Sequence, residues 1–232
     1  MKKYFFLLLL LPGWVCAQNS QVIAAGDNDD LMDKVSTHLQ FLFPEFTNGE
    51  VYFRNAPKGT GTLNYNMLAG EMQFLEDDEI MGIANVKDVV VVNIANRMFY
   101  PYNHTEFAEE ILVTDNCRLR VRRKGSIAQH SKSGAYGTSS STASITSYSS
   151  VNTDGRQYGL NVASNVLISL NYFYYLVGTN GKYTQIKNVK TFTKQFPVYK
   201  AQIETFVKER NIHFNKEEDL KALIVYCSEL SN

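Results

Sequence analysis

Short runs of alternating apolar and polar residues, separated by turn-forming residues, fill the stretch from Gly49 to Val113. The intervals between the runs leave no room for the helices that connect parallel strands. The region therefore predicts an antiparallel meander in which each strand pairs with its neighbours in sequence. The predicted strands are Glu50–Arg54, Gly61–Asn66, Glu71–Leu75, Ile80–Ala84, Val89–Ile94, Asn96–Tyr100 and Phe107–Val113.

Three further runs extend the β pattern toward the C-terminus. Leu119–Ile127, Val166–Val177 and Tyr183–Lys187 are rich in β-branched and aromatic residues, which favour strands. We therefore expect a mainly β fold of the α+β class. In this fold the antiparallel meander forms a sheet, a roll or a sandwich.

Apolar residues at helical spacing predict helices at both ends of the chain. From about residue 31 to 42 they recur as in a short amphipathic helix, which closes before Pro44. In the tail, Pro197 and Asn215 each fit the start of a helix, and the short connection between these helices predicts an antiparallel pair. The β-rich domain then spans residues 18–188, and the helical segment 189–232 packs on it.

Residues 131–153 are rich in Ser and Thr and hold few apolar side chains. Ordering such a segment costs about 1–2 kcal/mol of backbone entropy per residue, which so little apolar surface cannot offset. The segment is therefore predicted to form a long mobile loop.

The N-terminus has the order of features found in an export signal. Two lysines precede the apolar run from Tyr4 to Leu11, and small residues lead up to Ala17. The run is too short to cross a membrane, which takes about 20 apolar residues. We expect residues 1–17 to be a signal peptide, and the mature chain to have no transmembrane segment and to be periplasmic or extracellular.

The charge balance excludes one common class of partner. The chain has 23 Lys and Arg against 23 Asp and Glu, whereas domains that bind nucleic acid carry a basic excess. Nucleic acid is therefore not an expected ligand.

Two cysteines, Cys117 and Cys227, remain after removal of the leader. A disulfide between them fits an exported chain, but Cys227 lies on an apolar helical stripe, and the alternative is a pair of buried thiols. The four histidines are scattered singly, without the spacing of a metal site. The sequence therefore predicts no metal and no cofactor.

Several strings in the mature chain resemble a group of exported proteins of Bacteroidetes that have no assigned activity. They are FPEFTNGEVYF at Phe43–Phe53, LNYN at Leu63–Asn66 and EMQF at Glu71–Phe74. GAYG at Gly134–Gly137 and the helical tail are similar to the same group. The resemblance implies a location in the bacterial envelope and implies no catalytic residue or cofactor.

Arg118, Arg120 and Arg122 alternate along a predicted strand, so their side chains share one face. Such a row can hold a carboxylate, a phosphate or a sulfate. Two other interpretations stay open: an exposed strand whose charges prevent edge-to-edge pairing, or ion pairs with acids on a neighbouring strand.

The run from Tyr172 to Tyr175 places aromatic rings on both faces of another strand. One face is expected to enter the core, and the other is a candidate platform for a sugar ring or a hydrophobic ligand. Tyr172 and Tyr174 are our candidate ligand contacts, and Phe173 and Tyr175 are the alternative pair.

No pattern in the sequence selects catalytic residues. The chain lacks the G-x-S-x-G turn of a serine hydrolase, and the separation of paired carboxylates depends on the fold. The expected function is a non-catalytic binding or interaction module of the cell envelope. The alternatives are an envelope hydrolase acting on glycan or peptide and an assembly component with a protein partner. A hydrolase predicts a deep polar cleft with perturbed pKa values, whereas a binding module predicts a shallow surface lined by arginine or aromatic residues.

Overall fold

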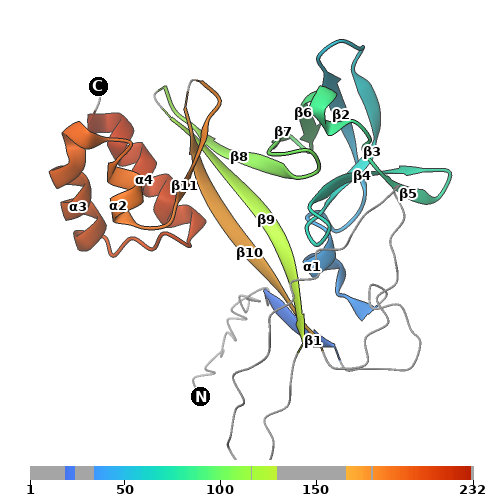
Figure 1. The fold of residues 1–232 in the computed structure, drawn as a ribbon, viewed down its shortest axis with the longest axis horizontal. Helices are drawn as coiled ribbons and strands as arrows, with labels where there is room; N and C mark the ends of the chain where they lie inside the picture. Colours follow the sequence, from blue (N-terminus) through green and yellow to red (C-terminus); the bar gives the residue numbers. More distant parts are fainter. Residues whose placement is uncertain (1–18, 24–33, 116, 130–165, 179, 231–232) are drawn as a thin grey trace, which may run out of the picture.

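One antiparallel sheet organises the chain. The structure is a computed structural model that describes residues 19–23, 34–115, 117–129, 166–178 and 180–230. Within these ranges it contains an eleven-stranded sheet and short helices near the C-terminus (Figure 1). The strands are β1 (Ser20–Ile23), β2 (Thr47–Phe53), β3 (Gly59–Asn66), β4 (Glu71–Glu76), β5 (Glu79–Gly82), β6 (Val89–Ile94), β7 (Arg97–Pro101), β8 (Phe107–Val113), β9 (Arg118–Gln129), β10 (Val166–Val177) and β11 (Tyr183–Ile186). The helices are α1 (Thr37–Gln40), α2 (Val189–Thr193), α3 (Lys200–Glu209) and α4 (Glu217–Leu230).

The predicted fold class is confirmed. The strands follow the order β1-β10-β9-β8-β7-β6-β2-β3-β4-β5, and β11 also pairs with β10. All of the strand pairs in the described ranges are antiparallel. The protein is therefore a mainly β, α+β structure built on a large antiparallel meander.

One connection departs from the simple meander. β6 pairs with the free edge of β2 and not with β5, which precedes it in sequence. The chain returns through a left-handed residue, Asn85 with φ of 55°, and a 3₁₀ turn at Val86–Asp88. The N–H of Arg54 donates to the carbonyl of Asp88 at 2.9 Å and holds this return against the end of β2. The expectation that sequence neighbours pair throughout is therefore wrong at this connection.

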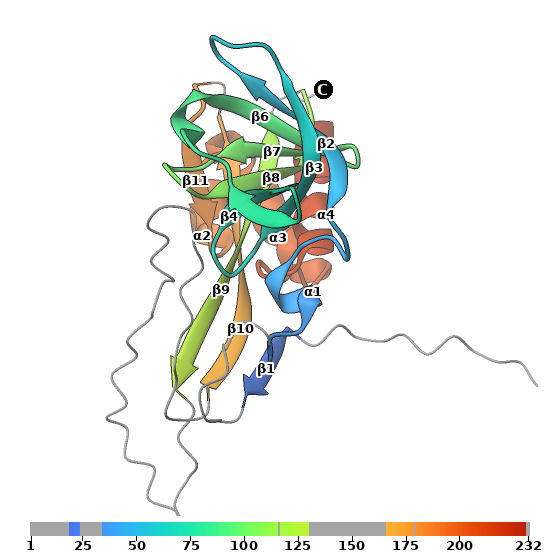
Figure 2. The same cartoon turned by 90° about the vertical axis from the view of Figure 1, so that its right-hand side faces the viewer.

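β9 and β10 form a ribbon of twelve residue pairs that supports two hydrophobic cores. At one end, Ile168 and Leu170 pack with residues of α1, β2–β4 and β6–β8. At the other end, Tyr174 and Leu176 pack with the C-terminal helices. These four residues lie on the same face of β10, and the twist of the strand turns that face toward different partners at its two ends. The length of the ribbon and the position of α1 beside β10 are visible in Figure 2.

The turn between β3 and β4 pairs with β9 in the part of β9 that extends past the start of β8. The N–H of Gly125 donates to the carbonyl of Met67 at 2.8 Å. A Cβ atom on Gly125 would lie 2.1 Å from the side chain of Leu68 and 2.9 Å from its Cα, so only glycine fits there. The hydroxyl of Tyr65 lies within 3.3 Å of the carbonyl oxygens of Phe107 and Arg123, where β8 and β9 diverge.

The helices differ in extent from those expected. α1 is a single turn, and the beginning of the helix predicted at residues 31–42 lies outside the described ranges. The C-terminal pair corresponds to α3 and α4, whose Phe206 and Tyr226 rings stack at 4.1 Å. The sequence did not predict α2, which begins with a capping box between Asn188 and Thr191.

Two predicted segments lie outside the described ranges. They are the signal peptide at residues 1–17 and the Ser/Thr-rich loop at residues 131–153.

The sequence analysis also missed β1, which pairs with the end of β10 from Val166 to Ser169. The C-terminal helices pack against β8–β11 in the second core.

Candidate functional site

The arginine row predicted from the sequence lies along β9. Arg118, Arg120 and Arg122 alternate on one face, and Lys124 continues the row. On the neighbouring strand β8, Glu110 stands directly opposite Arg120 in the register. An acidic side chain therefore meets the row from the adjoining strand.

Glu110 pairs with the first half of the row. It accepts hydrogen bonds at 3.1 Å from both Arg118 and Arg120. Arg120 also donates to the hydroxyl of Tyr183 at 2.6 Å, and its guanidinium lies 3.6 Å from the centre of the Tyr100 ring. The side chain of Arg120 is 10% exposed, whereas that of Arg118 is 49% exposed. Arg118 is therefore the more accessible cation.

Glu106 pairs with the second half of the row. It accepts a hydrogen bond from Lys124 at 2.7 Å and another from Arg122. Burial alone would raise the pKa of Glu106, but the hydrogen bonds from Lys124 and Arg122 lower it below its ordinary value. The Nε atom of Arg122 is buried and has no hydrogen-bond partner among the described atoms. This half therefore combines a fixed carboxylate with an unused guanidinium donor.

Aromatic rings from three elements border the row. The guanidinium of Arg122 lies 4.6 Å from the ring centre of Tyr102 and 4.8 Å from that of Phe173. The rings of Tyr102, Tyr175 and Tyr183 form a cluster with centre-to-centre distances of 5.2–5.7 Å. We call this surface the Arg–Tyr face and define it by Arg118, Arg120, Arg122, Lys124, Glu106, Glu110, Tyr100, Tyr102, Phe173, Tyr175 and Tyr183.

The sequence candidates Tyr172 and Tyr174 do not belong to this face. Tyr174 is 4% exposed in the core beneath the helices, and Tyr172 packs against both cores. Burial raises the pKa of Tyr174 to about 12. The alternative pair, Phe173 and Tyr175, shares the face of the arginine row, because Phe173 stands opposite Arg122 in the register. Tyr175 is 4% exposed, as is Tyr174, so Phe173 is the partly exposed ring of this run on the face of the arginine row. Which of these rings contact a ligand stays a prediction.

The Arg–Tyr face carries an excess of positive charge. Four cations share two carboxylates, Glu106 and Glu110. The most exposed cations are the end members of the row, Arg118 and Lys124, whose side chains are 49% and 40% exposed. They are six residues apart on an extended strand, which corresponds to about 20 Å. The face therefore presents two separated cationic ends with aromatic rings between them.

A second ion-pair network, which the sequence did not indicate, lies on the opposite face of β8. Glu109 is 5% exposed and accepts two hydrogen bonds from Arg97, at 2.6 and 2.7 Å, and one from Arg123. Arg123 also reaches Glu217 of α4 at 3.5 Å. Burial would raise the pKa of Glu109, but the hydrogen bond from Arg97 and the charge of Arg123 lower it. This network joins the sheet to the C-terminal helices.

Cys117 and Cys227 are not joined by a disulfide in the structure, and both are buried in the second core. Burial raises the pKa of Cys117 to about 11, and burial together with the nearby Cys117 raises that of Cys227 to about 12. The structure therefore corresponds to the alternative of two buried thiols. Both thiols are protonated at neutral pH and are poor nucleophiles.

The chain matches no family model, no curated protein and no solved structure. The described helices are too short or too polar for any of them to span a membrane. In the same parts of the chain, no three His, Cys, Asp or Glu side chains gather closely enough to hold a metal ion. The functional argument therefore rests on the geometry and charge of the surface.

Proposed function

We propose that the protein is an exported, non-catalytic binding module of the bacterial envelope and that its Arg–Tyr face binds an anionic ligand. The observation that carries the proposal is the charge excess on this face, where four cations share two carboxylates. The half-exposed guanidinium of Arg118 supplies donors that a carboxylate, phosphate or sulfate accepts in bidentate fashion. The export leader predicted at residues 1–17 supports the envelope location.

The position of the exposed cations favours an elongated ligand. Arg118 and Lys124 are separated by about 20 Å along β9, so one small anion does not reach both. A polymer that carries several anionic groups meets both ends and crosses the aromatic rings between them. Arg120 and Arg122 lie under this path and are held in place by their ion pairs and by the rings of Tyr100 and Tyr102.

The state of the carboxylates supports binding over catalysis at this face. A general acid in a glycosidase needs a raised pKa so that it holds a proton near neutral pH. The cations beside Glu106 lower its pKa, and Glu110 is bonded to two arginines. Both carboxylates are therefore suited to orient guanidinium groups.

The test compares three anionic polymers: dextran sulfate, polyphosphate and polygalacturonate. Binding of each is measured by calorimetry to the wild-type protein and to the double variant Arg118→Gln/Lys124→Gln. A charge-assisted hydrogen bond is worth about 1.5–3 kcal/mol, so the loss of one such contact weakens binding about tenfold or more. The preferred polymer identifies the anionic group.

The matched control is Arg54→Gln/Lys87→Gln, which removes one exposed arginine and one exposed lysine elsewhere on the surface. We expect the control to bind as the wild type does, apart from a small nonspecific effect. Equal losses in both double variants, or no binding of any of the three polymers, would overturn the proposal.

A further inference from the structure

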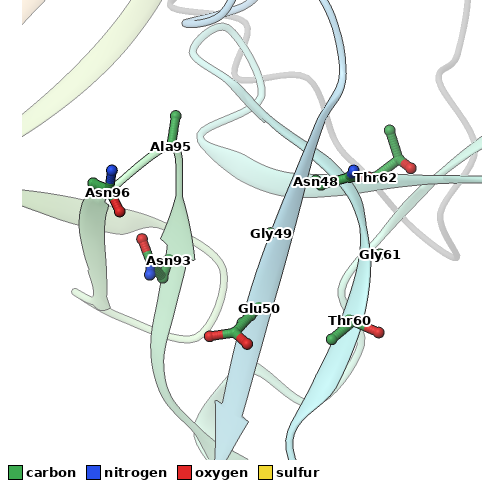
Figure 3. Close-up of a pocket in the computed structure, with 9 residues that line it drawn as sticks. All are labelled: Asn48, Gly49, Glu50, Thr60, Gly61, Thr62, Asn93, Ala95 and Asn96. Atoms are coloured by element: carbon green, nitrogen blue, oxygen red, sulfur yellow. The ribbon is translucent and has the colours of Figure 1, made fainter.

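A second polar surface lies on strands β2, β3 and β6, apart from the Arg–Tyr face. Figure 3 shows its side chains around the central strand β2. In the register, Glu50 stands between Thr60 of β3 and Asn93 of β6, and Asn48 stands opposite Thr62. Together with Asn96 of the following turn, these residues line an open hollow of about 530 Å³.

The strands beneath this hollow are packed closely and fix its shape. The alternate residues Val51, Leu63 and Ile94 point to the opposite side, where they belong to the first core. A Cβ atom on Gly49 would lie 2.7 Å from the carbonyl oxygen of Asn93 and 2.8 Å from the side chain of Leu63. Glycine at this position therefore allows β2 to approach β6, and the polar side chains on the outer side are set by a rigid sheet.

The polar groups of the hollow are largely without protein partners. The Oδ1 atom of Asn93 is buried and accepts no hydrogen bond, although buried polar atoms are normally paired. Within the described ranges, no hydrogen bond joins the side chain of Asn48, Thr60, Thr62 or Asn96 to another protein group. Three amides and two hydroxyls thus line one hollow. Their side chains are exposed or partly exposed, so a ligand can replace the water that hydrates them.

The charge of the hollow is balanced. Among the described residues that line it, Glu50 is the only ionisable one. Glu50 accepts hydrogen bonds from Lys58 and from the hydroxyl of Tyr52, the latter at 2.5 Å. Those bonds, first from Lys58 and then from Tyr52, lower the pKa of Glu50, which therefore stays ionised at neutral pH. The carboxylate is an acceptor fixed in place, and Lys58 neutralises its charge.

We propose that this hollow binds a neutral carbohydrate. Sugar hydroxyls both donate and accept hydrogen bonds, as do the amides and hydroxyls that line the hollow. An anionic ligand finds no cation among the described lining residues, and a cation finds no second acid there. Because the hollow is open, it can hold one sugar residue of a longer oligosaccharide while the neighbouring sugar residues lie outside it. This site does not depend on the Arg–Tyr face for its chemistry.

The experiment uses a glycan array that carries neutral and acidic oligosaccharides, probed with the full mature chain. The pocket variant is Asn48→Ala/Asn93→Ala, and the matched control is Asn55→Ala, an exposed asparagine in the turn between β2 and β3. We expect the wild type and the control to retain a set of neutral glycans and the pocket variant to bind them at least tenfold more weakly. Thermal unfolding of each variant reports whether it is folded.

A second variant keeps the test decisive if the first one does not fold. Thr60→Arg places a long side chain over the hollow from an exposed strand position and leaves the core unchanged. It should abolish retention of neutral glycans and preserve binding of anionic polymers. The proposal is overturned if no neutral glycan binds the wild type, if Thr60→Arg binds neutral glycans as the wild type does, or if Arg118→Gln/Lys124→Gln removes neutral-glycan binding.

Discussion

Replacing Glu109 with Gln tests whether the buried ion-pair network holds the sheet and the helices together. The carboxylate of Glu109 joins Arg97 and Arg123, and Arg123 is bonded in turn to Glu217 on α4. The variant Glu109→Gln preserves the size of the side chain and one acceptor oxygen but removes the charge. The side chain of Arg123 is 9% exposed, so water cannot replace the lost partner.

The expected loss follows from the burial of the three groups. Breaking a buried ion pair while one charge stays buried costs about 3–5 kcal/mol. Arg97 is 34% exposed and regains water, and Gln still accepts a hydrogen bond, so we expect the lower end, about 3 kcal/mol. Urea unfolding monitored by far-UV circular dichroism measures this difference at pH 7. The control Glu204→Gln removes a charge from an exposed pair with Lys200 at 3.9 Å, where we expect a loss of about 0.5 kcal/mol or less.

The pH dependence gives a second measurement of the same network. The pKa of Glu109 is lower in the folded protein than its ordinary value of 4.5. Its ion pairs therefore stabilise the fold fully above pH 4.5, and this stabilisation is lost as the pH falls through the lowered folded-state pKa. The Glu109→Gln variant should accordingly lose less stability on acidification than the wild type. A loss at pH 7 below about 1 kcal/mol, or parallel acid profiles, would refute the reasoning.

Three further predictions concern the fold. Gly125→Ala should lower the free energy of unfolding by about 1–3 kcal/mol, because the added methyl group clashes with Leu68; an unchanged urea midpoint would contradict this. Asn188→Ala should cost about 0.5–2 kcal/mol through loss of the capping box of α2, and thermal unfolding would show it. Cys117 and Cys227 should resist an aromatic disulfide reagent at pH 8 until the protein unfolds, since burial raises both pKa values; immediate reaction of the folded protein would count against the structure.

The sequence was most informative about local structure. Ten of the strands in the described ranges follow predicted runs, because alternation of apolar and polar residues reports which side chains enter a core. β1 was missed since its four residues, SQVI, offer too short a pattern. The pairing of β6 with β2 was missed for a different reason. The residues of the turn at 83–88 do not specify whether β6 pairs with β5 or with the free edge of β2.

The site was predictable in part. Alternation placed Arg118, Arg120 and Arg122 on one face, and that placement holds in the structure. The aromatic run gave no preference between its faces, so the assignment of Tyr172 and Tyr174 depended on where the helices pack. Glu110 was a usable signal, because an acid on a strand can meet an arginine on the neighbouring strand. Glu106 precedes β8 and lies in the loop after β7, so strand alternation did not place it.

The hollow on β2, β3 and β6 could not be found from the sequence. Its lining residues are separated by up to 48 positions along the chain, and only the strand register brings Glu50 between Thr60 and Asn93. Polar residues on alternate strand positions otherwise indicate an ordinary solvent-facing surface. The unpaired Oδ1 atom of Asn93 distinguishes this surface, and it results from the packing of three strands, which no local sequence pattern specifies.

The most direct test of the anion-binding proposal is to map where an anion binds. Nuclear magnetic resonance titration of the mature protein with a short sulfated oligosaccharide would follow backbone amides and arginine side chains together. We predict the largest shifts at Arg118 and Lys124, with smaller shifts at the rings of Tyr100 and Tyr102, and a weaker response as salt increases. Shifts confined to the C-terminal helices, or no response of the Arg118 guanidinium, would contradict the assignment of the Arg–Tyr face as the binding surface.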